Sequence, residues 1–232
     1  METNEKKRTK AKISYKLLLD IALTVLLMFI MAYQVTGDTL HEWLGICMTA
    51  LLIVHHILNR KWHGALFKGK YGAYRIISTA VNALLLISIL ITALCGMSMS
   101  GHAVPFMYGL VNVMTARKLH LAFSYWSFIF MGIHIGLHLK TMTAKLPDKA
   151  KPAFNILLTA SAGTGLWLFI RSGIIDYILF KTHFAFLDYE TAEWLVIVEN
   201  LAMLTLFALV GYMAVSIVQK GRDKKHLKKH EP

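Results

Sequence analysis

The chain has 232 residues, of which 56% are hydrophobic, and its formal net charge is +12. Soluble domains are about 45–50% apolar, and the excess here lies in long runs with few charges, which indicates an integral membrane protein. The basic residues cluster beside those runs, so they indicate membrane topology and contact with anionic lipid, and nucleic acid is not expected as a partner. The two cysteines, Cys47 and Cys95, are too few for a four-thiolate cluster.

Six apolar segments are long enough to be transmembrane helices, which predicts an all-α integral membrane helical bundle. In chain order they are residues 17–33, 41–58, 76–98, 119–139, 153–170 and 194–218. The first four, within 17–139, are expected to form a four-helix core. Two further transmembrane helices in 140–218 are expected to pack beside it, and basic tails flank the bundle at 1–16 and 219–232.

The distribution of positive charge predicts the orientation of the bundle. If the N-terminus is cytoplasmic, all but four of the 25 Lys and Arg residues fall in the two tails and in the loops 59–75 and 140–152. The exceptions are Arg117, Lys118, Arg171 and Lys181. Because cytoplasmic loops carry the excess of Lys and Arg, we expect a multi-pass protein of the cytoplasmic membrane with both termini in the cytoplasm.

Two pairs of histidines share one spacing: His41 and His55 on the second segment, and His120 and His134 on the fourth. Fourteen residues span about 21 Å of helix and bring both members of a pair to one face. Both segments run in the same direction, so His41 should lie level with His120, and His55 level with His134. Two stacked bis-histidine sites predict that the four-helix core binds two haems b. Each iron would then have an imidazole on either side.

Other residues near the histidines are expected to complete these sites. Gly45 and Gly132 would let a flat macrocycle approach the helix backbone closely. Arg117 and Lys118 lie beside His120, on the side where positive charge is disfavoured, so a local role is expected for them. That role would be to bind haem propionates or an acidic partner.

Both the choice of ligands and the function leave alternatives open. His56 lies about 100° around the helix from His55, and His138 lies one turn past His134, so these two are reserve ligands. His138 would otherwise contact a propionate or a quinone. The main alternative function is a haem-free transporter or channel whose histidines relay protons or bind a metal. A third reading is a membrane scaffold for a redox complex.

The chain contains His41-Glu42-Trp43-Leu44-Gly45 followed by His55 and Asn59, His120 followed by 134–138, and the stretches 169–174, 182–184, 186–189 and 199–203. These motifs resemble those of the flavinylation-associated membrane cytochromes, and the similarity covers about residues 15–215. The resemblance implies a b-type cytochrome that moves electrons across the membrane toward extracytosolic proteins that carry covalently bound flavin. The expected donor is a quinol or a cytoplasmic reductase, and whether the chain is itself an enzyme stays open. No glycine-rich phosphate loop follows a strand, so the flavin or nicotinamide partners would be separate proteins.

Overall fold

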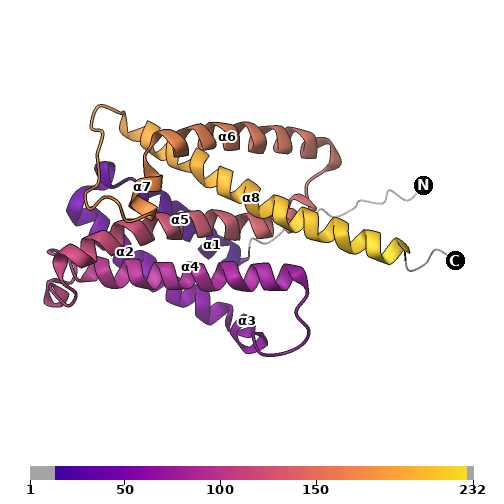
Figure 1. The fold of residues 1–232 in the computed structure, drawn as a ribbon, viewed down its shortest axis with the longest axis horizontal. Coiled ribbons are helices and arrows are strands. Elements are labelled where there is room, and N and C mark those ends of the chain that lie inside the picture. Colours follow the sequence, from indigo (N-terminus) through magenta and orange to yellow (C-terminus); the bar gives the residue numbers. More distant parts are fainter. Residues whose placement is uncertain (1–13, 229–232) are drawn as a thin grey trace, which may run out of the picture.

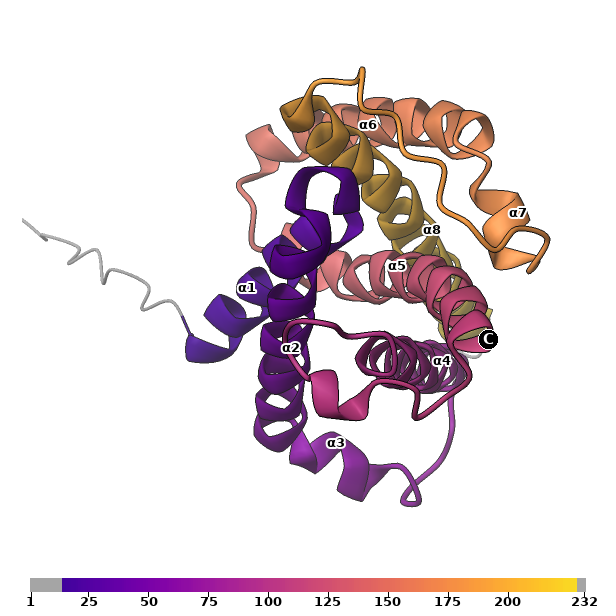
Figure 2. The ribbon, with the colours of Figure 1, turned by 90° about the vertical axis from the view of Figure 1, so that its left-hand side faces the viewer.

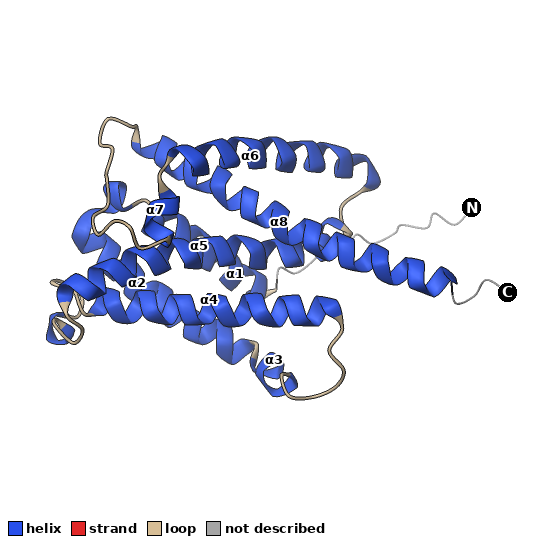
Figure 3. Ribbon diagram, viewed as in Figure 1, coloured by secondary structure: helices blue, strands red, loops and turns tan. Residues whose placement is uncertain are grey.

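The computed structural model describes residues 14–228, and every regular element in that part of the chain is helical (Figure 3). This confirms the all-α expectation. The elements are α1 Tyr15–Met31, α2 Tyr33–Leu58, α3 Arg60–Ala65, α4 Ala73–Met97, η1 Pro105–Met107, α5 Val113–Thr143, η2 Asp148–Ala150, α6 Lys151–Arg171, α7 Ile174–Ile178 and α8 Glu193–Lys228 (Figure 1).

Five of these helices, α2, α4, α5, α6 and α8, are long and apolar enough to cross a membrane. Large apolar side chains on their outer faces are exposed, among them Leu157, Trp167 and Ile217, as contact with lipid requires. Helix α1 has 17 residues, which is about 26 Å and somewhat less than a hydrocarbon core of about 30 Å. The membrane character is therefore confirmed, and the sixth span stays a prediction.

Helices α1 and α2 form a tight antiparallel hairpin. Ala32, which is completely buried, joins them, and Gly37 within α2 has a positive φ of 62° that breaks the helical geometry. Glycine adopts this φ without steric strain because it has no Cβ. At the other end of the hairpin, Lys16 Nζ donates to Leu58 O at 2.9 Å and to Asn59 Oδ1 at 3.3 Å. The start of α1 is thereby fixed to the end of α2.

The two ends of the bundle carry different segments (Figure 1). At one end, which we call the His41 end, lie the loop 98–112, helix α7 and the loop 179–192. At the opposite end, the His55 end, lie α3 and the loops 66–72 and 144–150. Helix α1 begins and helix α8 ends at the His55 end.

Helix α5 lies between α4 and α8, and α6 packs on the outer side of α8 (Figure 2). Glycines allow these close contacts. A Cβ on Gly136 would collide with the carbonyl of Ala208, and one on Gly165 with the carbonyl of Ala202. Small residues let helix backbones approach in this way when water provides no driving force.

One hydrophobic core joins the two parts of the chain that the sequence analysis separates. It includes Leu23 of α1, Phe128 of α5, Leu168 of α6 and Met203 of α8. Segments 17–139 and 140–218 therefore share their packing, and α8 is central to it. Helix α8 also continues to Lys228, so the basic segment after residue 218 begins as helix. Residues 1–13 and 229–232 lie outside the described part of the chain.

Candidate functional site

The structure brings His41 of α2 and His120 of α5 together at the His41 end. Their ring centroids are 6.0 Å apart, and the ring planes are inclined at 73°. Two imidazoles bound to opposite sides of one metal ion, each with a nitrogen about 2 Å from it, have centroids about 6 Å apart. Elsewhere the backbones of α2 and α5 hardly approach each other. The separation of the two rings is therefore compatible with one iron held between them, and it is also that of an ordinary edge-to-face contact.

Helix α4 orients the two predicted ligands on α5. His120 Nδ1 lies 2.9 Å from the backbone oxygen of Thr92, and His134 Nδ1 lies 2.8 Å from Asn82 Oδ1. Oxygens of this kind only accept, so in each case Nδ1–H donates, and Nε2 of the neutral ring keeps a free lone pair. Metal-bound histidines almost always have such a partner on the second nitrogen. Both rings are therefore in the tautomer that an Nε2 ligand needs.

Helix α1 supplies the corresponding partner for His55. His55 Nδ1 lies 2.9 Å from Asp20 Oδ1, so the carboxylate accepts a hydrogen bond from Nδ1–H. On the other side of the ring, Asn59 Nδ2 lies 3.4 Å from His55 Nε2, which is too long for a strong hydrogen bond. The carboxylate–imidazole arrangement is typical of metal-bound histidine, since it fixes the tautomer and raises the basicity of the ligand.

The second pair of predicted ligands is arranged differently from the first. The His134 ring contacts that of His138 with centroids 5.0 Å apart, and the His55 ring contacts that of His56 at 5.8 Å. Between His55 and His134 themselves, no ring contact of the His41–His120 kind is found within residues 14–228. Each reserve ligand therefore lies beside the residue it would replace, and His138 stays an alternative to His134.

Unlike His55, His120 and His134, His41 has no hydrogen-bond partner for its Nδ1. Its Nδ1 is buried and forms no hydrogen bond within the described part of the chain. An unpaired buried polar atom is costly. It is one of four such side-chain atoms, and the others belong to Ser127, His183 and Asn200.

Glu42, next to His41, is a positioning residue that the sequence analysis quoted only as part of a motif. Its carboxylate accepts hydrogen bonds from the Ser100 hydroxyl at 2.7 Å and from three successive backbone N–H groups, those of Gly101, His102 and Ala103, at 2.8–3.0 Å. These bonds fix the loop between α4 and α5 to α2. The sequence signal was an acidic residue inside an apolar segment.

The two glycines expected beside the haems differ in their surroundings. A Cβ on Gly45 would meet nothing within 4 Å, so this position has open space beside it. A Cβ on Gly132 would lie 2.6 Å from Phe207 Cβ on α8. Gly132 is two residues from His134 and so about 200° around the helix, which turns it toward α8. The close approach of α8 therefore accounts for a glycine at this position, and a role for Gly132 beside a haem stays a prediction.

A different glycine adjoins a predicted ligand. A Cβ on Gly96 of α4 would lie 3.0 Å from His120 Cε1 and 3.1 Å from His120 Nδ1. This space allows the His120 ring to lie close against α4, where it reaches the carbonyl of Thr92. Sequence spacing could not identify Gly96, because it belongs to another helix.

Arg117 and Lys118 lie in the second turn of α5, at the His41 end. The guanidinium carbon of Arg117 is 5.7 Å from the centroid of the Phe184 ring in loop 179–192. Arg117 is exposed and Lys118 is half-buried. Within residues 14–228 neither side chain forms an ion pair, so both charges are available to an acidic group that comes from outside the chain.

An apolar groove of about 510 Å³ lies between α2, α3 and α4. At its His55 end, His56 Nδ1 lies 3.1 Å from His63 Nε2. His56, which lines the groove, is the reserve ligand whose ring contacts that of His55. It is lined by Thr49, Leu52, Ile53, His56, Ile57, Arg60, His63, Leu86 and Leu90.

Among residues 14–228, no three or more His, Cys, Asp or Glu side chains are grouped so that they could hold a metal ion. A haem iron differs in this respect, since the porphyrin supplies four nitrogens and the protein only the axial ligands. Comparisons of the chain with protein-family models, with curated proteins and with solved structures found no match.

Proposed function

We propose that this chain is a membrane cytochrome that carries electrons across the bilayer through two b-type haems. The observation that carries the proposal is the His41–His120 pair, whose centroid separation of 6.0 Å fits two imidazoles on one iron. The hydrogen bond from His120 Nδ1 to Thr92 O supports it, because it leaves Nε2 for a metal. A bis-histidine haem, when bound, supplies one-electron chemistry suited to transfer.

The residues around each site would orient the histidine ligands and bind the haem propionates. At the His41 end, Glu42 fixes α2 to the α4–α5 loop, so that His41 stays opposite His120. Arg117 and Lys118 are the cations that would bind propionates there. In the second site, Asp20 orients His55 and Asn82 orients His134. Partners of this kind keep the ligand nitrogens in one tautomer and direction.

For the orientation, we place the His55 end in the cytoplasm. The basic loops 59–75 and 140–152 lie at this end, where α1 also begins and α8 ends (Figure 1). We take α1 as the sixth span, since 17 residues is at the lower limit for crossing. Both termini are then cytoplasmic, in the cytoplasmic membrane.

For the electron donor, we favour a membrane quinol over a cytoplasmic reductase. The groove between α2, α3 and α4 has apolar walls suited to an isoprenoid quinone, with His56, His63 and Arg60 as polar groups at one end. Small-molecule sites typically combine a mainly apolar lining with a few polar groups. The acceptor would be an extracytosolic flavin-carrying protein at the His41 end, as the family resemblance implies.

The test is haem content and its dependence on the four histidines. Pyridine haemochrome analysis of purified chain, produced with an adequate haem supply, should give about two haems b per polypeptide. His41→Ala and His120→Ala should each remove the same spectral component, and His102→Ala, at the same end, should remove none. A well-folded protein without a Soret band would refute the proposal and leave the haem-free transporter as the better account.

A further inference from the structure

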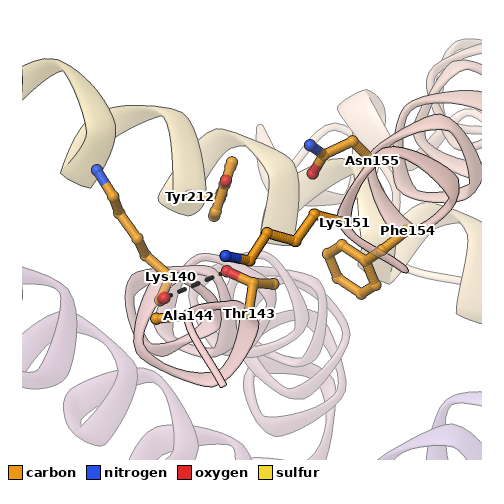
Figure 4. A pocket seen from close by; sticks show the side chains of 7 residues that line it. All are labelled: Lys140, Thr143, Ala144, Lys151, Phe154, Asn155 and Tyr212. Carbon is orange, nitrogen blue, oxygen red and sulfur yellow. Dashed lines mark hydrogen bonds between the residues drawn. The ribbon is translucent and has the colours of Figure 1, made fainter. Parts of the chain in front are cut away.

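A polar pocket of about 190 Å³ lies at the His55 end, far along α5 from the His41–His120 pair. It forms where the end of α5 meets the start of α6 and the side of α8 (Figure 4). Three helices therefore shape it, and none of the proposed haem ligands takes part. The lining residues are Lys140, Thr143, Ala144, Lys151, Phe154, Asn155 and Tyr212.

Two lysines from different helices give the pocket its charge. Lys140 comes from α5 and Lys151 from α6, and the ammonium group of Lys151 points toward the space between Thr143 and Tyr212 (Figure 4). Lys140 forms no ion pair within the described residues. Lys151 Nζ lies 2.7 Å from Asp148 Oδ1, but that aspartate is 94% exposed, and surface pairs of this kind are weak.

The neutral groups of the pocket also suit an anion. The side-chain amide of Asn155 and the hydroxyl of Tyr212 are donors, whereas the Thr143 hydroxyl already donates to Lys140 O at 3.2 Å. None of the seven lining residues is acidic. Lys151 is paired with the exposed Asp148, and the Lys140 side chain extends away from Lys151 (Figure 4), so both lysines must turn toward a ligand to bind it. Together with the two neutral donors, they indicate a site for an oxyanion such as a phosphate group.

The position of the pocket favours a lipid as the source of that phosphate. It lies at the end of α5 and the start of α6, beside Tyr212 of α8, and all three helices are able to cross a membrane. About one turn further along α6, Ile156 and Leu157 are each 70% exposed, a surface on which acyl chains can lie. Basic pockets between transmembrane helices on the cytoplasmic side commonly bind acidic head groups.

We propose that this pocket binds the head group of an acidic phospholipid, with the phosphate between Lys140 and Lys151 and the acyl chains along the exposed face of α6. This site does not depend on haem. It depends on the chain's place in the membrane, and its test is separate from that of electron transfer.

The experiment measures lipid retained by the purified full chain. The protein is exchanged into detergent with equal amounts of phosphatidylglycerol and phosphatidylcholine, and native mass spectrometry counts the bound lipids. We expect the chain to retain phosphatidylglycerol preferentially. Lys140→Gln with Lys151→Gln should lower that occupancy by about tenfold or more, because juxtamembrane lysines contribute strongly to binding anionic lipid.

The matched control replaces Lys145 and Lys149 by Gln. Both lie in the same exposed stretch of chain but do not line the pocket. An equal loss in this control would mean that only overall charge matters, which overturns the proposal, and so would no loss in the pocket variant. A third arm adds inorganic phosphate alone: if it displaces the lipid completely at low concentration, the site is one for free phosphate and the lipid assignment is wrong. Circular dichroism melting establishes that each variant is folded.

Discussion

The carboxylate of Glu42 on α2 accepts a hydrogen bond from the hydroxyl of Ser100, 58 residues later in the chain, at 2.7 Å. The same carboxylate also holds three backbone N–H groups of the α4–α5 loop. A carboxylate that fixes a loop in this way determines how α2 lies relative to α5. His41, which adjoins Glu42, is thereby held opposite His120.

Replacing Glu42 should disturb the His41 site more than the rest of the protein. Glu42→Ala leaves the loop N–H groups without their acceptor, at a cost of about 1–3 kcal/mol. We expect most of the spectral component assigned to His41 and His120 to be lost, and the component assigned to His55 to remain. Glu42→Gln keeps one acceptor oxygen and should fall between wild type and Glu42→Ala. If redox-resolved absorption spectra show both components falling together, Glu42 has a general structural role.

Replacing Asn82, the hydrogen-bond partner of His134, should affect only the second haem. Asn82→Leu removes the oxygen that accepts from His134 Nδ1, which lowers the basicity of the ligand. A less basic ligand stabilises ferrous iron, so the potential of that haem should rise, and haem affinity should fall by about 10–100-fold. Potentiometric titration measures both haems separately.

The control for this prediction is Thr92→Val on the same helix. His120 is bonded to the backbone oxygen of Thr92, which valine retains. Thr92→Val should therefore leave both potentials unchanged. A shift of the His41-end haem in Asn82→Leu would contradict the assignment of Asn82.

Glycine substitutions should distinguish effects on the His41 site from effects on helix packing. Gly96→Ala places a Cβ 3.0 Å from His120 Cε1, so the ring must move and the His41-end component should change. Gly136→Ala would collide with the backbone of α8, which cannot give way easily, so it should destabilise the whole bundle by about 1–3 kcal/mol. Gly163→Ala, with nothing within 4 Å, is the control. Thermal unfolding and absorption spectra of the three variants would show whether these effects separate.

Neutralising Arg117 and Lys118 should act on one haem and on partner docking. A nearby positive charge disfavours the more positive ferric state. Its loss should therefore lower the reduction potential of the His41-end haem. Reduction of an acidic acceptor should slow more at low than at high ionic strength, since salt screens steering. Arg171→Gln with Lys181→Gln removes equal charge at the same end and should leave the potential unchanged. Unaltered potentials together with salt-independent transfer would remove Arg117 and Lys118 from the site.

The sequence by itself determined the five long apolar helices and the faces on which the histidines lie, but not the short helices α3 and α7. Apolar runs predicted the membrane helices because hydropathy and helix length are properties of a local segment. The spacing of His41 and His55, and of His120 and His134, fixed each pair on one helix face because helical periodicity is also local. An unpaired charge within an apolar run, such as Asp20 or Glu42, was visible in the sequence, but its partner was not.

Only the tertiary structure decided which atoms meet. Asp20, Asn82 and the Thr92 carbonyl became partners of histidines through the packing of α1 and α4, and no sequence spacing relates them. Gly132 faces α8, which is distant in the chain. Helix α8 packs on one side of α5, and α4 packs on the other. Contacts between helices depend on how side chains from separate segments fit together, and this fit emerges only when all the helices are packed at once.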